Sequence, residues 1–236
     1  MKPFPSKSNA LSRILEHGLV FNSIIDIGVR ECTSELINYF PHAKHYLYEP
    51  VSFYFDTIHK NYAQIDYELN QVALSDKSAT CYQVCTCIDG SGNPTHSQVS
   101  DQPAIVDGKI VISSDTVQMS RLDDILNFEK VAGPTLFKID VDGHELPILH
   151  GATKSLEYVS VVIIETTCQE MTKRACFLEE HGFNLIEIVD LCYFCNTLSQ
   201  FDMIFVKKDI LTQNRKFSPW GVIPFSSDKW FPLFNI

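Results

Sequence analysis

The sequence has little positive charge and no long apolar run. Its 236 residues carry 19 Lys and Arg against 29 Asp and Glu, for a formal net charge of -10. The basic residues are also scattered, so the chain should repel a phosphate backbone and we expect no nucleic-acid partner. No apolar stretch approaches the roughly 20 residues that span a bilayer, and the start lacks the apolar core of a signal peptide. We therefore expect no membrane span and a cytoplasmic location.

The sequence also lacks internal repeats and low-complexity segments. Hydrophobic residues make up 45% and charged residues 20%, which is ordinary for a chain that folds throughout. Its length allows one large domain, or one domain with an appended part.

Apolar runs of strand length recur along the chain and alternate with helix-like stretches. The runs lie at 23–28, 45–50, 67–76, 135–143 and 160–166. This order predicts βαβ units and hence an α/β fold with a mostly parallel sheet. Near the C-terminus, two further runs at 183–191 and 201–208 flank a short polar break, which predicts a terminal antiparallel hairpin.

Two regions depart from this rhythm. A β-rich stretch with a Gly/Ser/Asn/Pro turn, around 79–121, predicts an insertion in the form of a ribbon or flap inside a main domain over 1–210. Residues 211–236 contain both Trp residues and repeated Pro. This extension is too apolar to extend freely into water, so we expect it to pack on the domain, on a partner subunit as in a homodimer, or across the mouth of the active site.

Five of the eight cysteines lie in two clusters that resemble metal half-sites, 81–87 and 192–195. In the first, Cys81, Cys85 and Cys87 share one parity of a strand and suit a buried face. In the second, Cys192 and Cys195 stand among apolar residues. We expect reduced, metal-free thiols that pack in the core.

The first apolar run ends in a pattern that favours a nucleoside site. Asp26 and Gly28 stand at the carboxyl end of a strand, where parallel sheets bind ligands. Glu49 ends the next strand, where a carboxylate can accept hydrogen bonds from a ribose diol. The following loop lacks the G-x-G-x-x-G series that holds a pyrophosphate. A nucleoside without phosphates therefore fits better, and S-adenosylmethionine is the common one. A plain turn is the other interpretation.

Ionisable residues crowd the end of the run at 135–143. Asp140, Asp142, His144 and Glu145 fall within six residues, with Gly143 turning the chain into a helix. Some of them can cap that helix. Four ionisable side chains in this stretch are more than a turn requires, which favours a functional role for at least one of them.

The order of these pieces resembles that of FkbM-family methyltransferases, which have the class I S-adenosylmethionine-dependent fold. The resemblance spans residues 22–206 and rests on the segments "IIDIG", "YLYEP", "NQVALSD", "SRLDDIL", "FKIDVDGHELPILHGA", "VVIIET" and "FDMIFV". It implies a Rossmann-like α/β fold, with a seven-stranded, mostly parallel sheet, an antiparallel last strand and helices on both faces. It also implies O-methylation of a hydroxyl on a small-molecule or glycan acceptor.

The resemblance further implies roles for single residues. Asp26 and Gly28 would line the methionine end of the cofactor, with Asp140 nearby, and Glu49 would bind the ribose. Ser75 or Asp76 would lie beside the adenine. The chain departs from the family at Arg30 and Cys32, where Asn and a second Gly are common, and at His144.

Removal of the acceptor proton needs a base. His144 has an ordinary pKa near neutrality and is the first candidate, with Asp140 second. An exposed, non-functional His144 is the other interpretation. Asp140, Asp142 and Glu165 could instead bind a divalent metal, although we favour a site without one.

Two other functions remain open from the residues alone. The altered loop and the aromatic extension would permit a non-catalytic nucleoside-binding or interaction module. An NAD(P)-dependent oxidoreductase would use a similar strand end.

Overall fold

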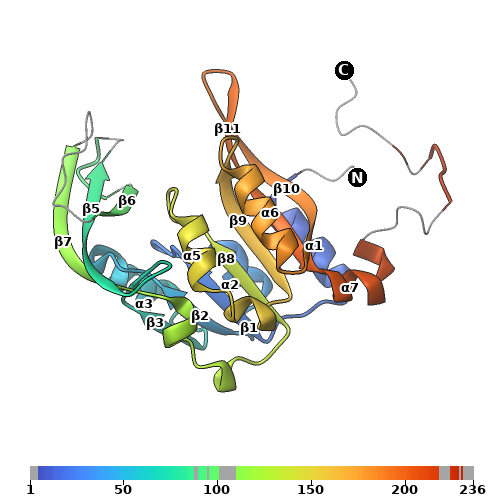
Figure 1. Ribbon diagram of the computed structural model, residues 1–236, viewed down its shortest axis with the longest axis horizontal. Coiled ribbons are helices and arrows are strands. Elements are labelled where there is room, and N and C mark those ends of the chain that lie inside the picture. Colours follow the sequence, from blue (N-terminus) through green and yellow to red (C-terminus); the bar gives the residue numbers. More distant parts are fainter. Residues whose placement is uncertain are drawn as a thin grey trace.

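The centre of the molecule is a seven-stranded sheet of order β10-β11-β9-β8-β1-β2-β3 (Figure 1). The computed structural model describes residues 5–87, 90–94, 96–100, 110–217, 224–228 and 230. The strands are β1 (Ser23–Ile27), β2 (Lys44–Tyr48), β3 (Tyr67–Asn70), β8 (Thr135–Ile139), β9 (Val161–Thr167), β10 (Phe183–Phe194) and β11 (Thr197–Lys207). Strands β3, β2, β1, β8 and β9 pair in parallel, and β11 runs antiparallel to β9 and β10. The predicted sheet and its antiparallel last strand are confirmed.

The central strands are mostly apolar on both faces, and helices cover both sides of the sheet. Every residue of β1 and β8 is buried, as is usual for strands inside a parallel sheet. Successive side chains point to opposite faces. Ile24 therefore packs against one layer of helices and Ile25 against the other.

The two helical layers lie in front of and behind the sheet in Figure 1. One layer contains α4 (Leu122–Ile125), α5 (Glu145–Gly151) and α6 (Met171–Glu180). The opposite face carries α1 (Lys7–Glu16), α2 (Ser34–Tyr39), α3 (Phe55–Asn61) and α7 (Lys208–Gln213). Single turns of 3-10 helix, η1 (Ser52–Tyr54), η2 (Phe128–Lys130), η3 (Ser155–Tyr158) and η4 (Arg215–Phe217), complete the connections.

The β-rich stretch forms a second sheet of order β4-β7-β5-β6, on the left in Figure 1. Its strands are β4 (Ala73–Leu74), β5 (Ala79–Cys87), β6 (His96–Ser100) and β7 (Ile110–Ser120). Strand β5 pairs antiparallel with both β6 and β7. The extension at 211–236 falls partly outside the described residues, so its packing and the expected homodimer stay predictions.

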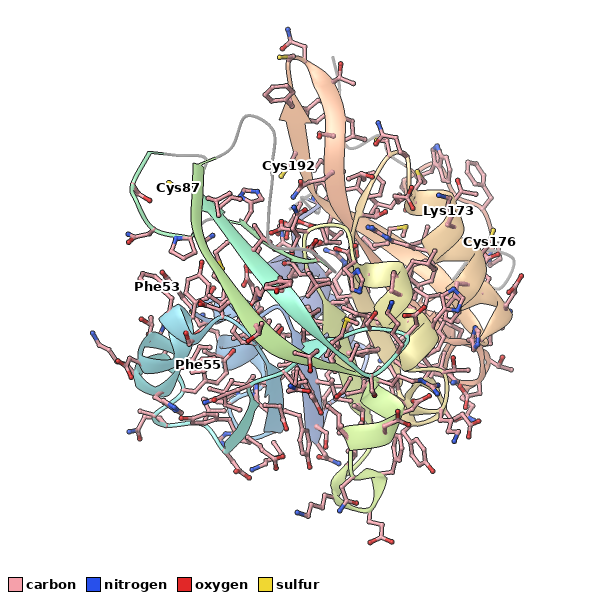
Figure 2. The ribbon with its side chains drawn as sticks, turned by 60° about the vertical axis from the view of Figure 1, so that its left-hand side comes forward. Phe53, Phe55, Cys87, Lys173, Cys176 and Cys192 are labelled. Atoms are coloured by element: carbon pink, nitrogen blue, oxygen red, sulfur yellow. The ribbon has the colours of Figure 1, made fainter. Side chains whose placement is uncertain are left out.

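The cysteines divide between core and surface. Cys81, Cys85 and Cys87 are buried, as their strand position predicts. The expectation for Cys192 and Cys195 is wrong, because both are exposed. Pairing between β11 and β9 ends at Gln200, so the β10–β11 hairpin extends past the rest of the sheet. Figure 2 shows Cys192 on this projecting hairpin.

Candidate active site

A cavity of about 550 Å³ lies at the carboxyl ends of β1, β2, β8 and β9. The loops after these strands form its floor, and β5 and β6 of the inserted sheet contribute Gln83 and residues 96–99. This is the edge of a parallel sheet where ligands bind, and the volume is typical of a cofactor site. Of the predicted residues, Gly28, Glu49, Asp140, Asp142, His144 and Glu165 line it.

Gly28 allows the loops after β1 and β8 to touch. Its φ of +78° is a left-handed conformation that favours glycine. A Cβ at this position would lie 1.8 Å from the carbonyl oxygen of Asp140. The glycine therefore brings the two loops into contact directly beneath the cavity.

Arg30 shows how the loop keeps its shape despite its departure from the family. Its φ is +55°, a region in which asparagine is far more common than arginine. The Arg30 amide donates to Glu49 Oε2 at 2.8 Å. The backbone turn that an asparagine would favour is thus retained, and Glu49 accepts its N–H.

Glu49 is a buried carboxylate held in place by the backbone. Its second oxygen, Oε1, accepts the amide of Val51 at 2.9 Å. Burial raises the pKa of Glu49 to about 7, and the two backbone hydrogen bonds together with Lys138 limit the rise. The carboxylate is therefore oriented before any ligand arrives, at the position expected to bind the ribose.

Lys138 is a site residue that we did not predict. Its Nζ lies 3.2 Å from Asp26 Oδ1 and 3.4 Å from Asp140 Oδ2, and it donates to the carbonyl of Gly28 at 3.1 Å. Burial would lower the pKa of Lys138, but Asp26 and Asp140 outweigh it and raise the pKa. The ammonium group stays charged and joins β1 to β8. A single charge inside the apolar run "TLFKI" was the available signal.

Asp26 lies below the cavity rather than in its wall. It is fully buried and does not line the cavity. Its carboxylate pairs with Lys138 and accepts the Tyr62 hydroxyl at 3.5 Å. Lys138, which does line the cavity, connects Asp26 to that surface.

Glu145 and Arg174 shape the loop that carries Asp140 and Asp142. Glu145 Oε1 accepts the amides of Val141 at 3.2 Å and Gly143 at 3.1 Å. Its other oxygen lies 2.5 Å from Arg174 Nη2, and both side chains are almost fully buried. Arg174, on α6, is a second residue that the sequence analysis did not predict. Nothing in its neighbouring residues, "MTKRACFL", indicates that it pairs with a buried carboxylate.

His144 contacts the predicted adenine-binding segment. Its Nε2 lies 2.9 Å from Ser75 Oγ, and Ser75 Oγ donates to Asp76 Oδ1 at 3.1 Å. Since the single hydroxyl proton of Ser75 goes to Asp76, His144 Nε2 is the donor and Nδ1 carries the lone pair. Burial lowers the pKa of His144, so the ring is neutral. Ser75 and Asp76 do not themselves line the cavity.

Glu165 faces the same cavity from β9. Burial raises its pKa to about 8, with further increases from Asp140, Glu145, Asp202 and Asp142. Gln200 donates to its Oε1 at 2.6 Å. Glu165 thus holds its proton at neutral pH. Within the part of the chain that the structure describes, no three His, Cys, Asp or Glu side chains are grouped to hold a metal ion.

The cavity suits a nucleoside cofactor on two counts. Its lining includes apolar side chains, as a purine ring requires, among them Val72, Leu74 and Ile148. The polar groups that line it include the oriented carboxylate of Glu49, which can accept from two hydroxyls. Together with the order of the sheet, this defines a class I methyltransferase fold, whose cofactor is S-adenosylmethionine.

The chain belongs to the family of the Methyltransferase FkbM domain, which matches residues 24–189. This confirms the resemblance in the sequence. Over 50 residues the chain is 38% identical to the hexuronic acid methyltransferase AglP of Haloferax volcanii, a match that spans only 21% of each protein. None of the helices among the described residues is long and apolar enough to cross a membrane.

Two solved structures are similar in fold. A precorrin-6y C5,15-methyltransferase from Geobacter metallireducens is 14% identical with a TM-score of 0.43, over 84% of this chain and 86% of that one. An S-adenosylmethionine-dependent methyltransferase from Clostridium acetobutylicum is 8% identical with a TM-score of 0.46, over 84% of this chain and 89% of that one.

Proposed function

We propose that this protein transfers a methyl group from S-adenosylmethionine to a hydroxyl of a sugar or natural-product acceptor. The family match supports methyl transfer and favours it over nucleoside binding alone or an oxidoreductase. The partial likeness to a hexuronic acid methyltransferase adds weak support for a sugar. The observation that carries the proposal is the contact of Lys138 with both Gly28 and Asp140.

Bound S-adenosylmethionine supplies an electrophilic methyl group on a sulfonium, which leaves as S-adenosylhomocysteine. The chain contributes alignment. In this proposal Glu49 accepts the ribose hydroxyls, and the backbone of Gly28 lies against the methionine end. Ser75 and Asp76 contribute to the adenine end through His144.

Two groups are candidates for the base that removes the acceptor proton. Asp140 abuts Gly28 and is partly exposed in the cavity, so it is placed beside the proposed methionine end. His144 is neutral but hydrogen-bonded to Ser75, beside the proposed adenine end. We therefore propose that Asp140 accepts the proton and that Lys138 orients its carboxylate. His144 becomes the second candidate.

Turnover of variants tests this assignment, with transfer of labelled methyl from S-adenosylmethionine to a carbohydrate fraction as the readout. Asp140→Asn should lose about 10²–10⁴ in turnover, the usual contribution of a general base. S-adenosylhomocysteine binding, measured by calorimetry, should stay near normal. His144→Gln should lose less. The reverse order of losses would make His144 the base, and no methyl transfer to any hydroxyl would contradict the function.

A divalent metal is the remaining alternative for lowering the pKa of the acceptor hydroxyl. Asp140, Asp142 and Glu165 are its candidate ligands, but among the described residues no three such side chains are grouped closely enough to hold an ion. Turnover should therefore survive a chelator. Loss of turnover in chelator, restored by Mg²⁺, would support the metal instead.

A further inference from the structure

A second, smaller chamber of about 230 Å³ adjoins the cofactor cavity. The two share lining residues, among them Ser97, Asp142 and Glu165. The chamber lies between β5 and β6 of the inserted sheet and the loop after β8, with β9, β11 and α6 behind it. Its volume is below the ~300–1,000 Å³ of a whole ligand site. It is thus large enough for only part of such a ligand.

The wall of this chamber has no aliphatic or aryl side chain among the described residues. Its members are polar, charged or glycine: Thr86, His96, Ser97, Gln98, Asp142, Gly143, Glu145, Glu165, Thr167, Arg174 and Gln200. The main cavity, in contrast, has Val72, Leu74 and Tyr54 in its wall. A flat aromatic acceptor would bury apolar surface against polar groups here and leave them without hydrogen bonds.

The hydrogen-bonding groups suit hydroxyls. The side chains of Ser97 and Thr167 each donate once and accept, and the amides of Gln98 and Gln200 do both at separate atoms. A sugar ring offers the same mixture of donor and acceptor at every hydroxyl. Such matched groups discriminate strongly against analogues that lack a hydroxyl.

The charges of the chamber disfavour an anionic ligand. Its one guanidinium, that of Arg174, is paired with Glu145 at 2.5 Å. His96 lies 3.9 Å from Asp142, and Asp142 keeps the wall acidic. A carboxylate placed here would meet acidic groups and no unpaired cation among these residues.

We propose that this chamber is the acceptor subsite and that it takes an uncharged polyhydroxylated ring, a neutral sugar, rather than a uronic acid or an aromatic alcohol. This inference rests on the proposed function, because only a methyl acceptor must lie beside the cofactor. In it, Ser97, Thr167 and Gln200 determine specificity. One acceptor hydroxyl reaches Asp140 while the rest of the ring occupies the chamber.

Ligand binding to the full-length protein, saturated with S-adenosylhomocysteine, tests the subsite without turnover. The probes are methyl α-glucopyranoside, methyl α-galactopyranoside, methyl α-glucuronide and catechol, observed by saturation-transfer NMR. At least one neutral glycoside should show transfer, and the glucuronide and catechol should show about tenfold less or none. Stronger transfer to the glucuronide or to catechol, or none to either neutral glycoside, would overturn the proposal.

Variants locate the binding. Thr167 lines only the smaller chamber, so Thr167→Trp should abolish transfer to the neutral glycoside while S-adenosylhomocysteine affinity changes less than about twofold. Gln200→Leu changes the polarity of the side chain with little change of volume and should weaken binding of the neutral glycoside about tenfold. This second variant keeps the test decisive if Thr167→Trp does not fold. The matched control is Thr197→Trp, an exposed threonine on β11 outside both cavities.

The outcomes separate the two levels of the proposal. If Thr167→Trp and Gln200→Leu both bind the glycoside as the wild type does, the chamber is not the subsite, although the methyltransferase function stands. If the wild type fails to bind S-adenosylhomocysteine, the proposed function itself fails and this inference with it.

Discussion

Two glutamates, the buried Glu49 and the partly buried Glu165, face one cavity from opposite sides of the central strands β1 and β8, and their surroundings differ. Glu49 accepts two backbone amides, which oppose the effect of burial and keep its pKa at about 7. Glu165 receives one side-chain amide and stands among four other carboxylates, which help burial to raise its pKa to about 8. The same residue type is thus prepared on one side as an acceptor and on the other as a neutral donor.

This difference shows how one sheet edge supports two kinds of recognition. On the Glu49 side the protein supplies donors to its own carboxylate, so the carboxylate is fixed in position for hydroxyls of a ligand. On the Glu165 side, burial and the surrounding negative charge together keep a proton on the acid. The following predictions, ordered from the largest expected effect to the smallest, test each side.

Removal of the ion pair between Arg174 and Glu145, which adjoins Glu165, should lower the free energy of unfolding most. Arg174→Leu leaves Glu145 buried without its cation, and loss of one partner of a buried pair typically costs about 3–5 kcal/mol. It also removes the hydrogen bond from Arg174 to the carbonyl of Glu165. Urea denaturation measures the change in the free energy of unfolding.

The matched control for Arg174 is its neighbour Lys173, which pairs with Glu170 on the exposed side of α6 (Figure 2). Lys173→Ala should cost less than about 1 kcal/mol, the usual value of a surface pair. Equal effects of the two substitutions would mean that the buried pair does not hold the loop.

A methyl group added at Gly28, between the loops after β1 and β8, should also lower the free energy of unfolding. Gly28→Ala combines a left-handed residue, at about 1–2 kcal/mol, with a clash against the Asp140 carbonyl, at about 1–3 kcal/mol. Gly18→Ala is the control, because Gly18 has a similar φ of +89° and no atom within 4 Å of the added Cβ. If urea denaturation shows that both substitutions lower the free energy of unfolding equally, the clash between the two loops is not the cause of the loss.

Cofactor affinity should separate the two glutamates. Glu49→Gln should weaken S-adenosylmethionine about tenfold, because charge-assisted hydrogen bonds are worth more than neutral ones. Glu165→Gln should change it less than about twofold. Wild-type affinity should rise as pH increases through about 7, where Glu49 loses its proton and accepts better. Calorimetry gives both results, and equal effects would place Glu49 outside the ribose site.

Stability should depend on pH in two separable windows. Both glutamates have folded pKa values above their ordinary 4.5, so the native state holds more protons than the unfolded state and the free energy of unfolding falls as pH rises. The contribution of Glu49 is lost by about pH 7 and that of Glu165 by about pH 8. Glu165→Gln should flatten the segment between those values in urea titrations, and Glu49→Gln should leave that segment unchanged.

The sequence was sufficient for the frame of the fold. The apolar runs, their alternation with helical stretches and the final hairpin are local patterns. They predicted a mostly parallel sheet with an antiparallel end, and the resemblance to the family implied seven strands. Gly28, Glu49 and Asp140 were recognisable because residues that end parallel strands meet at one edge. The exposed Cys192 and Cys195 were not, because their apolar neighbours gave no sign that the hairpin outgrows the sheet.

Contacts between distant segments were decided only in three dimensions. Lys138 meets Asp26 because β1 and β8 are neighbouring strands that place the two residues opposite each other, although 111 residues lie between them in the sequence. Arg174 meets Glu145 because α6 packs beside α5. The smaller chamber exists because the inserted sheet lies against the loop after β8. Periodicity and turn chemistry act over a few residues and are visible in sequence, whereas the partner of a buried charge is set by strand order and packing.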